Sequence, residues 1–293
     1  MRQVTCTGRG KRRGEEEEVE MGKKIRLEEL EEVEVEHLEG GIVTISLNRP
    51  ATRNALSRGL VARLRGVVEE LREEEGLRVV ILRSKVRGVF SSGADLKERS
   101  TMAEEEVVAF LGELRALVAA VEELPVAVVA ALDGSALGGG LELVLGCDLR
   151  VAARGALLGL PEVRRGVVPG AGGTQRLARL VGGGRASQLV LTGAPVPAEE
   201  AERWGLVNYC VEQEQGGAAA YTRALALARD MAGAAPLAVA VAKVALREGP
   251  EAGGLEEGLA VELACYSSLL HTRDRREGVQ AFLQKRQPVF LGK

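Results

Sequence analysis

Residues 136–150 read ALGGGLELVLGCDLR and place three glycines and a glutamate at the start of an apolar helix. Glycine inside a helix costs about 1 kcal/mol relative to alanine, so three in a row require a compensating role. A glycine-rich turn at a helix start leaves backbone N–H groups without intrahelical acceptors and directs them outward. With the positive end of the helix dipole behind them, these groups bind an anion or a developing oxyanion.

Two other interpretations of these glycines stay open. A phosphate site is disfavoured, because the stretch lacks the lysine of a G-x-x-x-x-G-K-[ST] loop and a complete G-x-G-x-x-G. Alternatively, the glycines serve only the close packing of a helix on a strand. A second turn, SSGAD at residues 91–95, favours the oxyanion interpretation because it also joins a predicted strand to a predicted helix. An ordinary capped loop is the alternative for this second turn.

The elements around this stretch predict an α/β core. Alternating apolar residues, interrupted by Gly40 and Gly41, indicate a β-hairpin that opens the ordered domain. Thr101 and Glu104 have the spacing of a capping box, and Pro125 ends the helix that follows. Strands are expected over 33–47 (the hairpin), 77–83 and 126–132, and helices over 57–74 and 101–124.

Beyond Gly217 the pattern changes to successive helices, and only residues 289–291 carry a strand signal. Helices are expected over 218–232, 237–247, 255–270 and 274–285. Such a region packs on the core or on a neighbouring subunit. The chain is therefore divided into a disordered or targeting tail (1–32), a core (33–230) and a helical oligomerisation region (231–293).

The composition argues against several classes of protein. The chain has 293 residues, of which 46% are hydrophobic and 28% are charged, which is enough for a large core. A net charge of -3 argues against a surface built entirely for nucleic acid. The four cysteines include no C-x-x-C pair, so we expect no structural zinc and a reducing compartment. The longest apolar run, within 126–132, is far shorter than the roughly 18 residues of a membrane span.

The amino-terminal residues differ in charge from the rest of the chain. Residues 1–14 carry basic side chains and no acid, and an acid-rich stretch runs from Glu15 to Glu39. Arginine without acid is one ingredient of a mitochondrial transit peptide, but the apolar face of such a peptide is missing. The alternative is a solvated, disordered tail.

Candidate acids and bases follow by elimination. The only histidines are His37 and His271, which lie far apart in the sequence. A Ser/His/Asp triad or a histidine metal centre is therefore not expected. Glu142 directly follows the three glycines, and Glu162 precedes another glycine-rich turn at residues 169–173. A carboxylate on an apolar helix is usually solvated at the surface. Beside an oxyanion hole it is instead a candidate general acid or base, with a pKa raised by desolvation.

Three segments resemble one known family. GVFSSGADLKE (88–98), ALGGGLEL (136–143) and GLPEVRRGVVPGAGGTQRL (159–177) resemble the enoyl-CoA hydratase/isomerase (crotonase) family, and the similarity runs from about Glu39 to the end. Within that family, the chain is most similar to the branch of methylglutaconyl-CoA hydratase and enoyl-CoA hydratase domain-containing protein 2. The resemblance implies an α/β fold, a spiral of ββα units followed by a helical trimerisation region.

The resemblance also implies a role for each matching residue. The N–H groups of Ala94 and Gly139 match the oxyanion hole that holds the thioester carbonyl of an acyl-CoA. Glu142 matches the glutamate that activates water for attack at Cβ, and Glu162 matches the one that delivers a proton to Cα. The positions that match substrate-binding and CoA-binding residues are Arg53, Ser92, Ala94, Asp95, Leu96, Lys97, Gly139, Phe282 and Lys285.

The two glutamates together favour an enoyl-CoA hydratase, which adds water reversibly and syn to a 2-enoyl-CoA thioester. Isomerases of this family often manage with one glutamate, and isomerisation, thioester hydrolysis and decarboxylation stay open as alternatives. A non-catalytic acyl-CoA-binding or RNA-binding protein is the alternative from a different class. The lysine row that serves RNA binding in the methylglutaconyl-CoA branch reads Arg58, Ala62 and Gly66 here, so RNA binding is not expected.

The resemblance also bears on cofactors, assembly and location. It implies no metal and no separate cofactor, since coenzyme A enters as part of the substrate. It implies a homotrimer or a dimer of trimers. The expected location is the mitochondrion, by analogy with the relatives, and the cytoplasm is the alternative.

Overall fold

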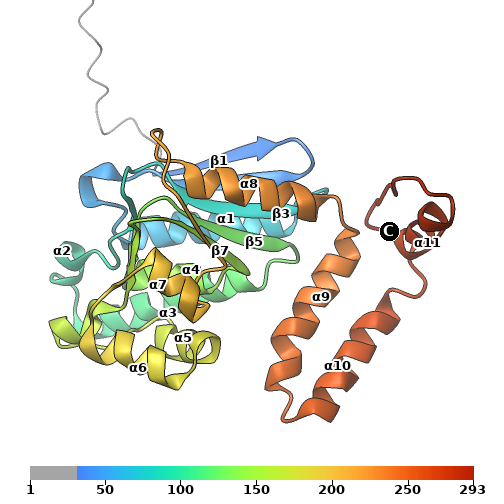
Figure 1. Ribbon diagram of the computed structural model, residues 1–293. Coiled ribbons are helices and arrows are strands. Elements are labelled where there is room, and N and C mark those ends of the chain that lie inside the picture. Colours follow the sequence, from blue (N-terminus) through green and yellow to red (C-terminus); the bar gives the residue numbers. More distant parts are fainter. Residues whose placement is uncertain (1–31) are drawn as a thin grey trace, which may run out of the picture. The chain divides into compact units, whose positions relative to one another are not determined.

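The computed structural model describes residues 32–293, so the tail predicted over 1–32 lies, except for Glu32, outside the described residues (Figure 1). The chain first forms the predicted hairpin from β1 (Val33–Leu38) and β2 (Ile42–Leu47). The two strands are antiparallel, with Val33 opposite Leu47 and Leu38 opposite Ile42. Gly40 and Gly41 form the turn, both with positive φ, as the sequence predicts for a tight connection.

A six-stranded sheet forms the centre of the fold, in the order β1-β2-β3-β5-β7-β10. Apart from the antiparallel β1 and β2, neighbouring strands are parallel. Side chains of β3 alternate between two apolar layers: Val80 and Leu82 face one, and Val79 and Ile81 face the other. The remaining strands of this sheet are β3 (Val79–Ser84), β5 (Ala127–Leu132), β7 (Leu149–Ala153) and β10 (Tyr209–Val211).

A second, four-stranded sheet has the order β4-β6-β8-β9. Its strands are β4 (Val89–Ser91), β6 (Ser135–Leu137), β8 (Leu157–Gly159) and β9 (Val196–Pro197). Along the chain, β3, β5 and β7 of the large sheet are each followed by a short strand of the small sheet and then by helical structure. This repeated unit is the predicted spiral of ββα units.

Helices cover both faces of the large sheet. α1 (Arg58–Arg72) and α3 (Glu104–Glu122) pack against each other on one face, and α8 (Ala219–Ala232) contacts β3, β5 and β7 on the other (Figure 1). Ser57 caps α1, and its Oγ accepts a hydrogen bond from the Leu60 N–H at 3.2 Å. The other helical segments of this part are η2 (Pro50–Thr52), α2 (Leu96–Arg99), α4 (Gly139–Leu145), η3 (Pro161–Arg165), α5 (Gly173–Val181), α6 (Gly183–Thr192) and α7 (Ala198–Trp204).

The start of α3 corrects one prediction. The capping box expected from Thr101 and Glu104 does not form: Thr101 Oγ1 donates to the carbonyl of Glu98 at 2.8 Å. Thr101 lies in the turn that follows α2, and α3 begins only at Glu104, after Ala103 as its N-cap. Its start is stabilised instead by Glu106, whose Oε2 accepts a hydrogen bond from the Ala103 N–H at 2.9 Å.

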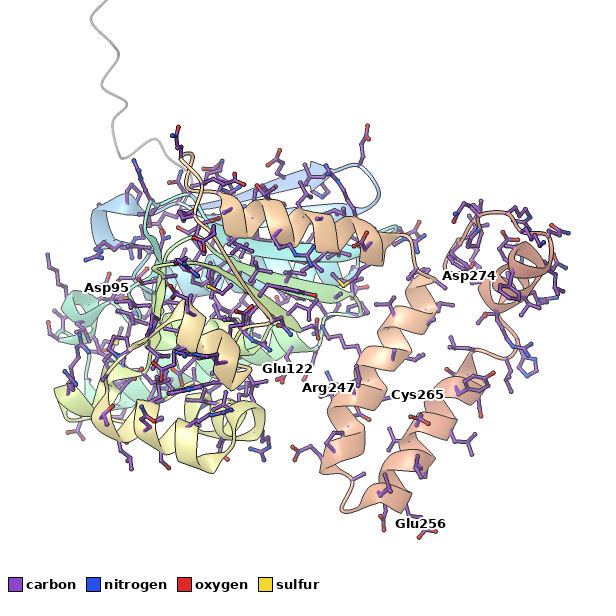
Figure 2. All side chains as sticks on the ribbon, in the orientation of Figure 1. Asp95, Glu122, Arg247, Glu256, Cys265 and Asp274 are labelled. Carbon is purple, nitrogen blue, oxygen red and sulfur yellow. The ribbon has the colours of Figure 1, made fainter. Side chains whose placement is uncertain are left out.

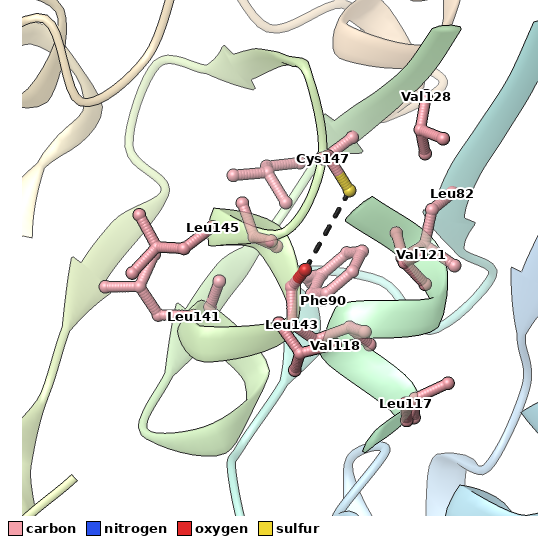
Figure 3. Packing of buried hydrophobic residues seen from close by; sticks show 14 of the residues in the cluster. Leu82, Phe90, Leu117, Val118, Val121, Val128, Leu141, Leu143, Leu145 and Cys147 are labelled. Carbon is pink, nitrogen blue, oxygen red and sulfur yellow. Dashed lines mark hydrogen bonds between the residues drawn. The ribbon is translucent and has the colours of Figure 1, made fainter. Parts of the chain in front are cut away.

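Helix α4 lies entirely in the apolar core. All seven of its residues are buried, and Figure 3 shows Leu141, Leu143 and Leu145 packed with Phe90 of β4. Cys147 follows the helix in the same cluster, and burial raises the pKa of its thiol to about 12. The apolar run that follows the three glycines is therefore the buried helix that the sequence predicts.

Three further helices follow α8: α9 (Pro236–Glu248), α10 (Leu255–Ser268) and α11 (Arg273–Leu283), with η4 (Gly249–Glu251) between the first two. Lys243 of α9 connects this region to the core, since its Nζ donates to Val126 O at 3.0 Å and to Asp148 Oδ2 at 2.7 Å. Within residues 32–293 no single helix has the length and apolar composition of a membrane span. Helix α8 and the following segment Pro236–Glu251 have this length and composition only when taken together, and they are bent by 111° at the break between them.

The strand predicted over 289–291 is wrong. The Leu291 and Gly292 N–H groups donate instead to the two carboxylate oxygens of the buried Asp274, each at 2.8 Å. The backbone oxygen of Lys293 accepts hydrogen bonds from the N–H groups at the start of α11. These hydrogen bonds hold residues 289–293 against the start of α11, so the apolar residues 289–291 do not pair with a strand.

Candidate active site

The two predicted turns meet where α4 passes β4. A Cβ added to Gly140 would lie 2.6 Å from Ser91 Cβ, and one added to Gly93 would lie 2.9 Å from Leu137 O. Gly93 also has a φ of +93°, which side chains other than hydrogen rarely tolerate. The glycines thus allow two backbone segments, far apart in sequence, to approach more closely than any other residue type permits.

This approach brings the amides of Ala94 and Gly139 to one place. Leu56 pairs with Ala94 in a parallel bridge made of two hydrogen bonds. The Leu56 N–H donates to Gly93 O at 2.8 Å, and the Asp95 N–H donates to Leu56 O at 3.1 Å. Because backbone groups alternate in direction along an extended segment, the N–H of Ala94 points away from Leu56. A Cβ added to Gly139 would lie 3.9 Å from the Ala94 nitrogen. Gly139 is the first residue of α4, where helix N–H groups have no intrahelical acceptor.

Glu142 is buried one turn further along α4, with 3% of its surface exposed. Its Oε1 accepts hydrogen bonds from the Ala171 N–H at 2.7 Å and the Gly173 N–H at 2.8 Å. Desolvation raises the pKa of this carboxyl above its ordinary value, and the two amides oppose that rise. A Cβ added to Gly173 would lie 2.9 Å from Oε1, so glycine is needed there for the contact.

Glu162 lies in η3 and faces the same site. A Cβ added to Gly138 would lie 2.9 Å from Glu162 Oε1, which places this carboxyl beside the glycine turn of α4. Its Oε2 is buried and has no hydrogen-bond partner among the described residues. Desolvation, with a further contribution from the charge of Glu142, raises the pKa of Glu162 to about 7.

The two carboxyl groups therefore differ in their hydrogen bonding. Desolvation raises the pKa of both, but Glu142 has amide donors that favour its ionised form, whereas Glu162 Oε2 has no partner among the described residues. Two nearby carboxyl groups with different hydrogen bonding can act as a base and an acid. Beside them, the amides of Ala94 and Gly139 can stabilise negative charge on an oxygen.

Five of the predicted CoA-binding positions gather around the turn of Ala94. The carbonyl of Arg53, which has a left-handed backbone, accepts a hydrogen bond from the Ser92 N–H at 3.1 Å. Asp95 caps α2 and forms an ion pair with Arg49 at 3.3 Å. Leu96 and Lys97 follow in α2 with exposed side chains.

Phe282 and Lys285 are not brought to this site within one chain. They belong to α11 and the residue after its cap, and Phe282 is 83% exposed. Figure 2 shows Asp95 and Asp274, which lie at the starts of α2 and α11, on opposite sides of the molecule. The sequence match for this pair thus finds no geometric support inside the single chain.

Sequence reasoning missed the groups that surround Glu142. The loop Gly170–Gly173 supplies its amide donors, and Arg115, Glu122 and Arg176 contact that loop or one another. The run PGAGG at residues 169–173 was the available signal, since it precedes a helix as GGG does in α4. Within residues 32–293, no three His, Cys, Asp or Glu side chains are arranged to hold a metal ion.

Comparison with known proteins finds consistent similarities. Residues 37–293 match the family model described as enoyl-CoA hydratase/isomerase. The chain is 48% identical over 265 residues to mouse enoyl-CoA hydratase domain-containing protein 2, mitochondrial, covering 89% of each protein. It is 43% identical over 285 residues to mouse methylglutaconyl-CoA hydratase, mitochondrial, covering 97% of this chain and 89% of the mouse protein. The crystal structure of enoyl-CoA hydratase from Bacillus anthracis superposes with a TM-score of 0.86 at 42% identity, covering 90% of this chain and 100% of the bacterial one.

Proposed function

Because the chain belongs to the enoyl-CoA hydratase/isomerase family of acyl-CoA enzymes, we propose that it adds water reversibly to the double bond of a 2-enoyl-CoA. The observation that carries this proposal is the pair Glu142 and Glu162, with opposite hydrogen bonding beside two convergent amides. Addition of water needs a base for the water and an acid for the carbon, and this pair supplies both.

In the proposed mechanism, the N–H groups of Ala94 and Gly139 hold the thioester carbonyl oxygen. Ionised Glu142 takes a proton from water as the water oxygen bonds to Cβ. The electron pair of the double bond moves toward Cα, and negative charge develops on the carbonyl oxygen, where the two amides stabilise it. Protonated Glu162 then delivers its proton to Cα, so both additions come from the side of the carboxyl groups and are syn.

The principal alternatives are other reactions of the same family: double-bond isomerisation, thioester hydrolysis and decarboxylation. Isomerisation needs one group that moves a proton between two carbons. A second buried carboxylate would then take no part in the reaction. Hydration uses both glutamates. Two arginines of α1 argue against an RNA-binding function, since Arg58 pairs with Glu98 and Glu106 and Arg65 pairs with Glu69 and Glu113.

We propose that residues 231–293 form an oligomerisation region, with a homotrimer or dimer of trimers as the assembly. A groove of about 800 Å³ runs between α9 and α10. Large apolar side chains are exposed on these helices and beyond, which predicts a protein–protein contact. They are Leu246, Leu255, Leu259, Leu263, Tyr266, Leu270, Val279, Phe282, Leu283, Val289 and Leu291.

In such an assembly Phe282 and Lys285 serve the CoA site of a neighbouring subunit. The test combines a Glu162→Gln chain, whose own site is inactive, with a Phe282→Ala/Lys285→Ala chain in mixed oligomers. Activity above that of either variant alone supports service across subunits. A monomer in sedimentation equilibrium contradicts the assembly, and mixed oligomers without recovered activity contradict the role of this pair.

The reaction is tested by identifying the product formed from crotonyl-CoA and, separately, from 3-methylglutaconyl-CoA. Hydration adds one water to the mass, isomerisation leaves the mass unchanged, hydrolysis releases free CoA, and decarboxylation removes carbon dioxide. A hydrated product from either thioester supports the proposal and ranks the two substrates. Any of the other products, without hydration, overturns it.

We also propose a mitochondrial location, with the cytoplasm as the alternative. The support is that the names of the mouse relatives place both of them in the mitochondrion. Imaging of the full-length chain with a carboxyl-terminal tag tests this, and a diffuse cytoplasmic signal would contradict it.

A further inference from the structure

The loop Gly170–Gly173 presents two amides to Glu142, although glycine-rich segments can adopt many backbone conformations. We propose that Arg115 and Arg176 are positioning residues for Glu142, which act by fixing the peptide planes of this loop. The inference rests on the proposed function, in which Glu142 activates the water.

The first peptide plane joins Gly170 to Ala171. A peptide unit is planar and trans, so its carbonyl and its N–H point in opposite directions. Arg115 of α3 donates from Nε to Gly170 O at 2.6 Å. The opposite side of this plane is the Ala171 N–H, which donates to Glu142 Oε1 at 2.7 Å. Holding the carbonyl toward α3 therefore holds the amide toward Glu142.

The second plane joins Ala171 to Gly172. Arg176 of α5 donates from its NH1 nitrogen to Ala171 O at 3.3 Å. The same guanidinium pairs with Glu122 of α3, from its NH2 nitrogen at 2.6 Å and from Nε at 3.2 Å to Oε2. Gly172 has a φ of +99°, a backbone conformation that favours glycine at this position.

The third plane joins Gly172 to Gly173. The Gly172 carbonyl accepts hydrogen bonds from the Gln175 and Arg176 N–H groups in the first turn of α5, at 3.0 and 2.9 Å. Its opposite side is the Gly173 N–H, which donates to Glu142 Oε1 at 2.8 Å. Helix α5 thus fixes the third plane, and the arginines fix the first two. The first and third planes carry the two amides that bind Glu142, and the second plane joins them.

The charged groups that face Glu142 among the described residues are Arg115 of α3 and Glu162 of η3. Arg115 acts both as a charge and as a hydrogen-bond donor to the loop. Arg176 donates to the loop, and its guanidinium is paired with Glu122. We therefore expect Arg176 to act on Glu142 mainly through the loop.

The matched control is Arg179, three residues further along α5. It pairs with Glu251 at 2.8 Å and does not contact the loop. The test compares Arg176→Gln, Arg115→Gln, Arg115→Lys and Arg179→Gln, first by hydration kinetics with crotonyl-CoA. Arg115 is exposed, so its variants are expected to fold even if the loss of the Arg176 ion pair lowers stability.

We expect Arg176→Gln and Arg115→Gln to lower kcat by about 10-fold to 100-fold with KM changed by less than about 3-fold. In both variants the acidic limb of the pH profile shifts to higher pH, because Glu142 loses amides that favour its ionised form and its pKa rises. Arg115→Lys restores most of kcat, and Arg179→Gln leaves kcat and the limb unchanged. A merely structural role would lower the active fraction and leave the limb in place.

Wild-type kinetics and an unmoved acidic limb in both glutamine variants would overturn the inference. A second readout does not depend on turnover: the carboxyl carbon of Glu142, labelled with ¹³C, is titrated by NMR. A raised pKa of Glu142 in Arg176→Gln supports positioning, and an unchanged one overturns it. If the wild type hydrates no enoyl-CoA, the proposed function fails, and the titration alone decides whether the arginines position Glu142.

Discussion

Glu142 Oε1 accepts hydrogen bonds from two backbone amides, whereas Oε2 of the neighbouring Glu162 is buried without a partner among the described residues. The negative charge of Glu142 contributes to the raised pKa of Glu162, so the two carboxyl groups interact. The loop Gly170–Gly173 thereby affects both groups, because it stabilises the charge on Glu142 that disfavours a second charge on Glu162.

Replacing Glu162 by Gln should stabilise the fold in a pH-dependent way. The pKa of Glu162 is about 7 in the folded chain, above the ordinary value of 4.5, so the folded state holds this proton more tightly than the unfolded state. Between these two values, rising pH removes stability from the wild type and not from the variant. Denaturant unfolding should show a gain that grows from pH 5 to pH 8 toward an upper limit of about 3 kcal/mol. A gain that is constant over this range would contradict the prediction.

The pH dependence of catalysis should follow from the same group. Glu162 must be protonated to donate to Cα, so kcat/KM for hydration should fall as pH rises through about 7. The measurement is the initial rate with crotonyl-CoA between about pH 5.5 and pH 9. Circular dichroism at each pH separates this loss from unfolding. A rate that stays level up to the basic end would show that Glu162 does not act as the acid.

Gly140→Ala should damage both stability and catalysis. The added Cβ would lie 2.6 Å from Ser91 Cβ and 3.0 Å from Ser91 O, so α4 and β4 must separate. We expect a loss of about 1–3 kcal/mol and slower hydration, because the amides of Ala94 and Gly139 move apart. The matched control is Gly66→Ala in α1, where the Cβ meets nothing within 4 Å. This control should gain about 0.5–1 kcal/mol and keep its activity. Equal effects of the two substitutions would contradict the account.

Lys243→Met should loosen the contact between α9 and the core. The Lys243 ammonium donates to Val126 O and Asp148 Oδ2 and is 11% exposed. Its loss should lower the free energy of unfolding by about 1–3 kcal/mol. The control is Arg247→Met on the same helix, since among residues 32–293 Arg247 pairs only with the exposed Glu248 beside it. Hydrogen exchange of α9 should rise in the first variant alone, and unchanged protection there would refute the role of Lys243.

Much of the fold can be predicted from the sequence because its elements have strong periodic patterns. The hairpin, the helix after Ser57 and the four carboxyl-terminal helices appear within a few residues of their predicted bounds. The terminal strand fails because apolar spacing does not report that Asp274, buried in the fold, binds the nearby backbone amides. The capping box fails because Glu106 supplies a better-placed acceptor than Glu104.

The site divides in the same way. The sequence indicates the two turns and the two glutamates, since glycine runs and isolated carboxylates in apolar segments are visible in one chain. It cannot indicate that the loop Gly170–Gly173 turns its amides toward Glu142, because Arg115 and Arg176 are ordinary helix residues in sequence. Only the folded backbone shows which carbonyl each guanidinium meets.

The most direct test of the central claim is the loss of enoyl-thioester absorbance when wild type, Glu142→Gln and Glu162→Gln are each mixed with crotonyl-CoA. Calorimetric titration with acetyl-CoA shows that each protein binds an acyl-CoA. The account predicts turnover by the wild type and a loss of about 100-fold to 10,000-fold in each variant, with acyl-CoA binding retained. Turnover that survives in either variant would contradict the assignment of that glutamate, and a wild type that binds acyl-CoA without hydrating crotonyl-CoA or 3-methylglutaconyl-CoA would contradict the proposed reaction.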